Sequence, residues 1–269
     1  MNRALVAIFV AASAQFATAQ TVESFTEPYR KVDLVPAESG VLRSLEVREG
    51  EQVAKNQRVG ALDCEVQEIA LAIARANLDA RGQLESAAAE RDLRKSRLAK
   101  LQELQTSGHA THDEVERAIA DLAVAEANFL AATEKRKIDE LEHRRISALI
   151  ERRILKSPID GVVTRLYKEE AEFVGGSTAP LMTIMQLDPL RITFSVPNSH
   201  AQALRVGQSV ALALPESKRR AIGEVEFVSP VTDAESGTVR VKVLLKNSDG
   251  QYRSGVRCEI ELSTTPTQP

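Results

Sequence analysis

The sequence predicts an elongated, modular α+β chain, and three observations lead to that prediction. A short pattern occurs twice with every matched pair 121 positions apart, a long helical segment lies between the two copies, and alternating strands follow the second copy. The matched residues are Gly40-Val41-Leu42, Leu45, Glu51 and Val53 in the first copy, and Gly161-Val162-Val163, Leu166, Glu172 and Val174 in the second. Two half-domains that must meet in space, separated by helices that go out and come back, describe a hairpin held at its base.

The two half-domains are residues 35–64 and 154–188, which read as short strands punctuated by glycines. Together they predict one β-sandwich cut in two. Glu49-Gly50-Glu51 is typical of a tight turn in which glycine supplies a positive φ. Gly50 is matched by Ala171 in the second copy, so we expect the second turn to differ in backbone geometry. Residues 20–34 are expected to be a polar lead-in that ends in a short strand-like piece.

Residues 65–153 predict an antiparallel coiled-coil hairpin, with two independent helices of a bundle as the alternative. Good helix formers dominate, and each arm of about 40 residues would be roughly 60 Å long. Gly108 can end the first arm in a left-handed cap, and Thr111 with Glu114 forms a capping box that starts the second. The apolar residues expected on the inner faces step by threes and fours, namely Val66, Ile69, Ile73, Ala76 and Ala80, then Val115, Ala118, Leu122, Ala125 and Phe129. The charged residues are expected on a solvated outer face.

Residues 189–262 predict a small antiparallel β-barrel. Ile192, Phe194 and Val196 alternate with polar residues, and Pro197 opens a short helix expected over residues 198–205. Further alternating strands follow up to Leu262, and residues 263–269 are expected to be a disordered tail.

The N-terminus has the composition of a cleaved export signal over residues 1–19. Arg3 gives a positive start, an apolar run follows, and Ala17-Thr18-Ala19 fits the small-x-small cleavage rule, which predicts a mature chain from Gln20. An uncleaved membrane anchor is the alternative, although the run is short for a span. The net charge of −3 argues against nucleic-acid binding.

The sequence offers no catalytic constellation, no phosphate-binding glycine loop and no close set of metal ligands, so we expect neither catalysis nor a cofactor. Cys64 and Cys258 fall in different predicted domains and are expected to be separate small buried residues. His109 and His112 flank the predicted tip of the hairpin. A pH-sensing or metal-binding role for them is conceivable, but histidines on a loop are usually solvated polar residues.

The ordered motifs resemble those of the periplasmic adaptor proteins of bacterial efflux pumps, the membrane fusion proteins of the HlyD-like superfamily. The motifs that carry the resemblance span most of residues 35–262, and each is weak alone. They are Gly40-Val41 with Glu49-Gly50-Glu51-x-Val53, Lys156-Ser157-Pro158-Ile159-Asp160-Gly161-Val162-Val163, Leu187-Asp188-Pro189-Leu190, Phe194-Ser195-Val196-Pro197, Val228-Ser229-Pro230-x-x-Asp233, Gly237-Thr238-Val239-Arg240-Val241 and Gly255.

The resemblance implies a lipoyl-like barrel-sandwich hybrid, a coiled-coil hairpin and a β-barrel in a non-catalytic periplasmic adaptor. It would link an inner-membrane efflux transporter, with the resistance-nodulation-division (RND) type favoured, to an outer-membrane channel, and several copies would form a ring. An ABC-type exporter as partner, or a periplasmic coiled-coil scaffold without a transporter, are the alternatives. A carrier role is disfavoured, because no lysine follows Leu62-Asp63-Cys64, where a carrier presents one. Many adaptors continue past the barrel into a membrane-proximal β domain, and we expect it to be dispensable here or the partner to differ.

The resemblance also places a channel-docking motif at the hairpin tip. Lys100, Leu104 and Thr111 have the spacing of the family's arginine, leucine and small hydroxyl residue, around the turn at Gly108. Lys100 would be a charged contact, Leu104 an apolar anchor and Thr111 a hydroxyl partner. Lysine lacks the forked geometry of arginine, and Arg97 one turn earlier competes for its role. The alternative is that Leu104 packs in the seam and Thr111 is only a helix cap.

Overall fold

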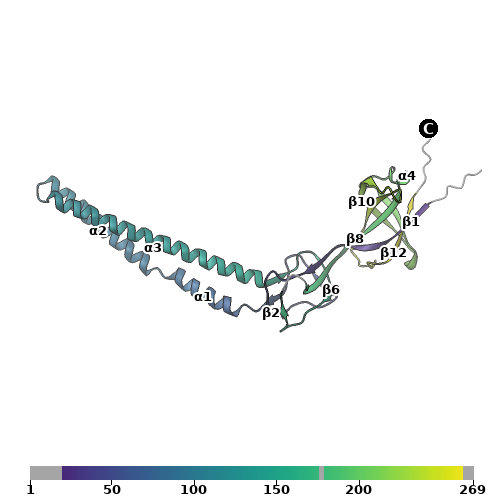
Figure 1. Cartoon of the computed structure of the whole chain (residues 1–269), viewed down its shortest axis with the longest axis horizontal. Helices are drawn as coiled ribbons and strands as arrows, with labels where there is room; N and C mark the ends of the chain where they lie inside the picture. Colours follow the sequence, from purple (N-terminus) through teal and green to yellow (C-terminus); the bar gives the residue numbers. More distant parts are fainter. Residues whose placement is uncertain (1–19, 176–178, 263–269) are drawn as a thin grey trace, which may run out of the picture.

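The structure is a computed structural model that describes residues 20–175 and 179–262. It is an elongated chain with a β-barrel at one end, a β-sandwich in the middle and a long helical hairpin that extends from the sandwich (Figure 1). The expected export signal (residues 1–19) and C-terminal tail (residues 263–269) lie outside the described residues.

The barrel is a closed ring of antiparallel strands. Its strands are β1 (Gln20–Leu34), β8 (Met182–Pro197), β9 (Ser209–Leu214), β10 (Arg219–Thr232), β11 (Thr238–Leu245) and β12 (Arg257–Leu262). They are hydrogen-bonded in the order β1-β12-β9-β10-β11-β8, and β8 pairs back onto β1. Alternating residues of these strands fill the interior, among them Ile192, Phe194 and Val241, each fully buried. Closure leaves the barrel without a free sheet edge.

Residues 20–34 are not the polar lead-in expected from the sequence but the 15-residue strand β1. Residues 20–25 pair with β12 in the barrel, and residues 26–34 pair with β8 toward the sandwich. The prediction was wrong because both pairings join segments that are far apart in the chain, which no local pattern reveals. The short helix after Pro197 is also shorter than expected, since α4 covers only Asn198–Ala201.

The sandwich is built from both halves of the repeat. One layer contains β5 (Ile154–Lys156), β4 (Arg58–Leu62), β2 (Gly40–Leu45) and β7 (Phe173–Val174), paired in that order. In the other layer β3 (Gln52–Val53) pairs with β6 (Gly161–Leu166), which pairs with β8. Leu42, Leu62, Val163 and Leu181 are fully buried between the layers.

The two copies of the repeat contact each other crosswise. Gly40 in β2 lies opposite Val174, and its counterpart Gly161 in β6 lies opposite Val53. The Leu42 N–H donates to the Glu172 carbonyl at 2.8 Å, and the Val163 N–H donates to the Glu51 carbonyl at 2.9 Å. Each half therefore supplies the strand that completes the other half, which explains why the pattern occurs twice.

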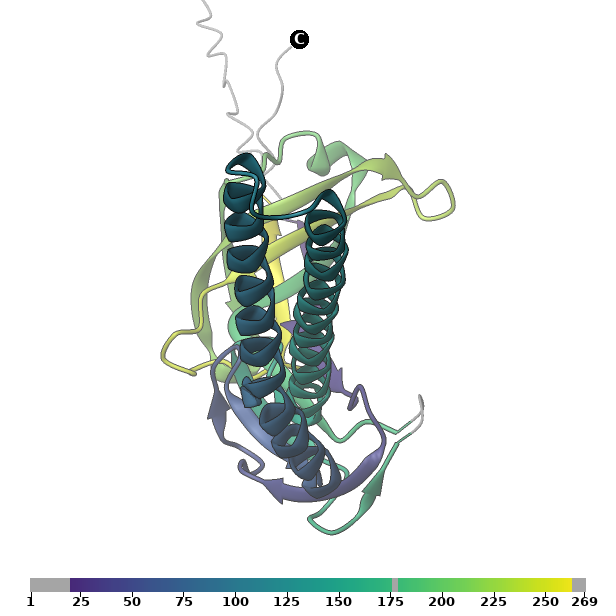
Figure 2. The ribbon, with the colours of Figure 1, turned by 90° about the vertical axis from the view of Figure 1, so that its left-hand side faces the viewer.

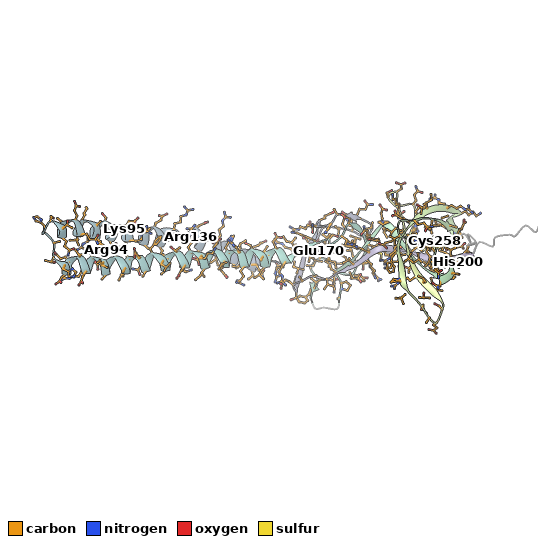
Figure 3. All side chains as sticks on the ribbon, turned by 90° about the horizontal axis from the view of Figure 1, so that it is seen from above. Arg94, Lys95, Arg136, Glu170, His200 and Cys258 are labelled. Atoms are coloured by element: carbon orange, nitrogen blue, oxygen red, sulfur yellow. The ribbon has the colours of Figure 1, made fainter. Side chains whose placement is uncertain are left out.

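Side chains repeat the same symmetry. The Leu45 N–H donates to Glu170 Oε1 at 2.8 Å, and the Leu166 N–H donates to Glu49 Oε1 at 2.7 Å. Glu170 lies in the sandwich, at the base of the hairpin (Figure 3).

The expectation that the two turns differ was wrong. Gly50 has φ +87° and Ala171 has φ +67°, so both turns use the left-handed conformation. Both N–H groups also donate across the sandwich at 2.8 Å, from Gly50 to the Val163 carbonyl and from Ala171 to the Leu42 carbonyl. The crosswise hydrogen bonds impose the turn geometry even where the residue is alanine.

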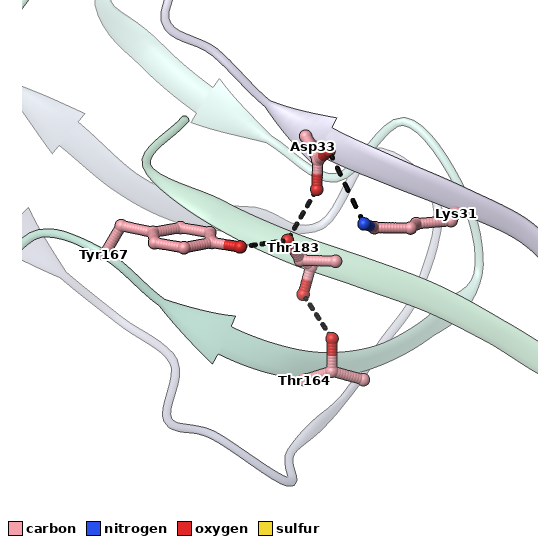
Figure 4. Close-up of polar contacts among 5 residues, drawn as sticks. All are labelled: Lys31, Asp33, Thr164, Tyr167 and Thr183. Atoms are coloured by element: carbon pink, nitrogen blue, oxygen red, sulfur yellow. Dashed lines mark hydrogen bonds and ion pairs between the residues drawn. The ribbon is translucent and has the colours of Figure 1, made fainter. Parts of the chain in front are cut away.

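A polar cluster connects four segments of the sandwich around Thr183, which is 2% exposed (Figure 4). The Thr183 hydroxyl donates to Asp33 Oδ1 at 2.6 Å and lies 3.2 Å from the Tyr167 hydroxyl. The Thr164 hydroxyl donates to the Thr183 carbonyl at 3.3 Å. The contacts connect β1, β8, β6 and the loop after β6, and satisfy a buried hydroxyl.

The hairpin has a broken first arm and a continuous second arm. The first arm comprises α1 (Glu65–Asp79) and α2 (Gly82–Thr106), and the second is α3 (His112–Arg153), whose 42 residues make it roughly 60 Å long. The break lies at Ala80, whose backbone is extended with ψ 100°. α2 runs alongside α3, and α1 continues the first arm toward the sandwich, where it diverges from α3 (Figures 1 and 2).

The arms meet in a coiled-coil seam with alternating steps of three and four residues. The seam residues are Gln67, Leu71, Ala74 and Leu78 in α1, Leu84, Ala87, Arg91, Arg94, Leu98, Leu101 and Gln105 in α2, and Val115, Ala118, Leu122, Ala125, Phe129, Ala132, Arg136, Asp139, His143, Ile146 and Ile150 in α3. The predicted inner face of the second arm is therefore confirmed.

The predicted inner face of the first arm was wrong. Val66, Ile69 and Ile73 face outward and are 75%, 58% and 59% exposed. The helix carries two apolar stripes of the same period, and the seam uses the other one. Leu78 and Leu84 are six residues apart, one fewer than the seven-residue repeat of the seam. A continuous helix would have to be overwound to keep both leucines in the seam, and the break at Ala80 removes this need.

Within residues 20–175 and 179–262, none of the helices combines the length and the hydrophobicity that a membrane span requires.

Candidate functional site: the hairpin tip

The end of the first arm is fixed by its own backbone. The His109 N–H donates to the Leu104 carbonyl at 2.8 Å, and the Gly108 N–H donates to the Gln105 carbonyl at 3.1 Å. These are the two hydrogen bonds of a Schellman cap, which requires a left-handed residue at Gly108, where φ is +78°. The predicted role of Gly108 as the helix-ending glycine is confirmed.

The second arm starts with the capping box that the sequence predicted. The Glu114 N–H donates to Thr111 Oγ1 at 3.3 Å, and the Thr111 N–H donates to Glu114 Oε2 at 2.8 Å. The Thr111 hydroxyl also donates to Glu114 Oε2 at 2.9 Å. The hydrogen bonds from the Thr111 backbone and hydroxyl hold the pKa of the Glu114 carboxyl below its usual value. The Thr111 hydroxyl therefore already has an internal role.

Leu104 lies outside the seam. Its neighbours Leu101 and Gln105 occupy the seam positions of the last turns of α2, whereas Leu104 is 44% exposed. Lys100, one turn earlier, is also exposed. The structure thus places an apolar and a cationic side chain on neighbouring turns of α2, next to the rigid turn at Gly108. Arg97 is exposed as well, so exposure does not separate it from Lys100.

The two histidines of the tip, His109 and His112, lie exposed on the surface. His112 Nε2 lies 3.2 Å from Glu116 Oε1, and both side chains are largely exposed. In the part of the chain that the structure describes, no three His, Cys, Asp or Glu residues are grouped closely enough to hold a metal ion.

The base of the hairpin is held by arginines from the end of α3. Arg153 Nη1 donates to the Asp63 carbonyl at 2.5 Å, next to the start of α1, and Arg152 Nη2 lies 2.9 Å from Glu38 Oε1. Both helices therefore leave one rigid base, and this fixes where the tip points. The sequence did not indicate these two contacts. Cations are favourable at the C-terminal end of any helix, and this alone accounts for Arg152 and Arg153 in the sequence pattern.

The two cysteines are separate free thiols, as predicted. Cys258 is buried in the barrel, and burial raises the pKa of its thiol to about 11. Cys64 is only partly buried, in contrast to the prediction. Its thiol donates to Glu68 Oε1 at 3.1 Å. Burial is the largest cause of the raised pKa of the Cys64 thiol, and this hydrogen bond is the second.

Comparison with known proteins finds similarity to one family model and to curated relatives. Residues 190–266 match the RND-type family model described as the CusB-like β-barrel domain. The antibiotic efflux pump periplasmic linker protein ArpA of Pseudomonas putida is 28% identical over 86% of the chain. The chain is thus similar in sequence, over most of its length, to a periplasmic linker protein of an efflux pump.

Two further comparisons concern a part of the sequence and the fold. The nodulation protein NolF of Rhizobium meliloti (strain 1021) is 35% identical over 38% of the chain. MacA from Actinobacillus actinomycetemcomitans has a similar fold, with a TM-score of 0.77 and 21% identity over 92% of this chain and 79% of MacA. The matches cover 28% of NolF and 59% of ArpA, so the chain spans less than two-thirds of the length of either relative.

Proposed function

We propose that the chain is a non-catalytic periplasmic adaptor that links an inner-membrane efflux transporter of the RND type to an outer-membrane channel. The observation that carries this proposal is the separation of the tip from the barrel: α3 holds the tip roughly 60 Å away from the sandwich, and the closed β-barrel lies beyond the sandwich (Figure 1). The match of residues 190–266 to a CusB-like barrel and the similarity to a periplasmic linker support the RND assignment.

The sandwich acts as a clamp in this proposal. We assign it a lipoyl-like fold whose connecting hairpin is replaced by the coiled coil, over residues 35–64 and 154–188. The crosswise pairing of β2 with β7 and β3 with β6 means that neither half is complete alone. No lysine follows Leu62-Asp63-Cys64, where a carrier domain would present one, so the fold is used for rigidity rather than for carrying a group.

The tip is the surface that docks on the channel. Leu104 provides the apolar anchor, and Lys100 provides a positive charge one turn away. Gly108 ends the first arm and Thr111 starts the second, so these two residues position the turn that connects the arms. An exposed leucine outside the seam gains burial only if a partner covers it, and full burial of such a side chain contributes about 1.5–3 kcal/mol.

Site-directed crosslinking tests this docking. With Leu104→Cys or Gly108→Cys in cells, a thiol crosslinker is expected to capture an outer-membrane channel protein. Lys95→Cys, exposed about two turns nearer the base of the same helix, is the matched control (Figure 3). Capture of nothing larger than the chain itself from position 104, or equal capture from position 95, would count against the tip assignment.

Deletion of the gene tests the adaptor function as a whole. Loss of resistance to a drug or a toxic metal, restored by the wild-type chain and not by Leu104→Asp, is the expected result. Unchanged resistance to every exported compound would favour a periplasmic scaffold without a transporter. Copurification with an ATP-binding exporter instead of a proton-driven transporter would favour the ABC alternative.

The proposal places the chain in the periplasm, associated with the inner membrane through its transporter, after cleavage of residues 1–19. N-terminal sequencing of the exported protein is expected to begin at Gln20. Several copies are proposed to surround the export path as a ring.

A further inference from the structure

A cavity of about 440 Å³ lies at the base of the hairpin, where α1 leaves the sandwich next to β2 (Figure 1). Its walls come from three parts of the chain, which are strands β2 and β4 of the sandwich, the start of α1 and the end of α3. The volume lies in the range of sites that hold small molecules, about 300–1,000 Å³. Neither docking at the tip nor the clamp role of the sandwich gives this cavity a task.

Three arginines from separate elements line the cavity, namely Arg43 in β2, Arg58 in β4 and Arg153 at the end of α3. The side chains of Arg43 and Arg58 are half exposed, so the cavity opens to solvent. Glu68 is the carboxylate that lines the same cavity, so three positive charges face one negative charge. Because like charges repel, this convergence is favourable only when further negative charge lies between the guanidinium groups.

The contacts of Arg43 and Arg153 leave their charge poorly compensated. Arg43 Nη1 lies 3.8 Å from Glu68 Oε1, which is longer than a hydrogen bond. Arg153 Nη1 donates to the Asp63 carbonyl, which carries no net charge. Among the described residues, no carboxylate oxygen lies within 4.0 Å of the Arg153 guanidinium. Both arginines can therefore gain from an anion in the cavity.

Arg58 and the start of α1 add to the positive potential. Arg58 Nε lies 2.7 Å from Glu46 Oε1 outside the cavity, but a guanidinium has five N–H donors, so further donors remain for a ligand. Cys64, the N-cap residue of α1, makes no side-chain cap hydrogen bond. The positive end of the helix dipole lies here as well and favours an anion.

The remaining wall of the cavity is apolar. It is formed by Ala61 and Leu62 in β4, Ile150 in α3 and Ile154 in β5. An inorganic ion would leave this wall to water, whereas a ligand with an apolar body gains by covering it. The lining thus combines an anion-binding side with an apolar side.

We propose that this cavity binds a small phosphomonoester. The phosphate lies between the guanidinium groups of Arg43, Arg58 and Arg153, which match phosphate oxygens with paired N–H donors, and the apolar body covers Ile150 and Ile154. A phosphomonoester carries about 1.5–2 negative charges at pH 7 and so balances the excess of two positive charges in the lining, which a single carboxylate cannot do. The site involves neither a transporter nor a channel, so its failure leaves the adaptor proposal untouched.

Protection of Cys64 from alkylation locates the ligand, because this partly buried thiol lines the cavity. The purified full chain is treated with iodoacetamide at pH 8, with and without phenyl phosphate, and labelling is followed by mass spectrometry. Labelling of Cys64 is expected to slow by about tenfold when phenyl phosphate is at about ten times its dissociation constant, since only the unoccupied fraction reacts. No protection, or equal protection by phenol or by sodium chloride at the same ionic strength, would overturn the proposal.

Calorimetric titration with phenyl phosphate tests the charges one at a time. Arg43→Gln and Arg58→Gln are each expected to weaken binding by more than about tenfold, because each removes charge-assisted hydrogen bonds. Glu68→Gln removes the carboxylate that repels the phosphate and is expected to tighten binding several-fold. Arg165→Gln in β6, on the other layer of the sandwich, is the matched control and should bind as the wild type does. Unchanged affinity in both arginine variants of the cavity, weaker binding in Glu68→Gln, or equal weakening by Arg165→Gln would contradict the assignment.

Inorganic phosphate tests the apolar wall. It is expected to bind more weakly than phenyl phosphate, because it leaves the apolar side chains of the cavity uncovered. Equal affinity for the two compounds would overturn the assignment of an organic phosphate to this cavity.

Discussion

Ala171 carries the clearest energetic consequence of the crosswise repeat. It holds φ +67°, a conformation that costs an L-residue roughly 1–2 kcal/mol, while its counterpart Gly50 holds φ +87° at no such cost. Replacing Ala171 with glycine removes that strain but increases the entropy of the unfolded chain by an equivalent of about 0.4–1 kcal/mol. The net expectation for Ala171→Gly is a sandwich more stable by about 0.5–1 kcal/mol.

The reciprocal change provides the matched control. A methyl group at Gly50 would meet no atom within 4 Å, so Gly50→Ala changes the backbone preference alone and is expected to destabilise by about 0.5–1 kcal/mol. The double variant Gly50→Ala with Ala171→Gly exchanges the two turns and should return to within about 0.5 kcal/mol of the wild type.

Amide hydrogen exchange measures these effects inside the sandwich, where a global melting curve would mix the modules. The N–H groups of Leu42 and Val163 report on the two crosswise hydrogen bonds. Slower exchange in Ala171→Gly and faster exchange in Gly50→Ala are expected. Faster exchange in Ala171→Gly, or no change in Gly50→Ala, would refute the argument that the two turns share one geometry.

Three further predictions concern the tip, the core and the thiols. The lowered pKa of Glu114 stabilises the capping box at pH values above the ordinary glutamate value of 4.5, and this contribution is lost as the pH falls through the lowered pKa. On acidification the amides of the tip should therefore lose protection from exchange, relative to their intrinsic exchange rates at each pH, in the wild type and not in Glu114→Gln. The same loss of protection in the variant would contradict this assignment. Leu42→Ala removes a fully buried side chain and is expected to destabilise the sandwich by about 2–5 kcal/mol, whereas Val41→Ala, at a position 43% exposed, should change it by less than about 0.5 kcal/mol in urea denaturation. In the native protein at pH 8 a thiol reagent should label Cys64 and spare Cys258 until unfolding; rapid labelling of both would show that the barrel core opens.

Much of the candidate site could be predicted because its signals are local. A helix cap depends on residues within one turn, so Gly108, Thr111 and Glu114 were enough to place both ends of the tip. The inner face of the first arm could not be predicted in the same way. Val66, Ile69 and Ile73 have the period of a seam stripe, and only packing against α3 shows that Leu71, Ala74 and Leu78 occupy the seam instead.

The sequence by itself determined the modular order, because an offset of 121 between two strand patterns, with helix formers between them, leaves little choice of topology. Tertiary structure alone decided the rest. It made residues 20–34 a strand shared by barrel and sandwich, gave Ala171 a glycine-like turn, and turned one of two apolar stripes on the first arm outward. The physical reason is common to all three outcomes. Each depends on contacts with residues far away in the chain, and the conformational preferences of neighbouring residues do not predict such contacts.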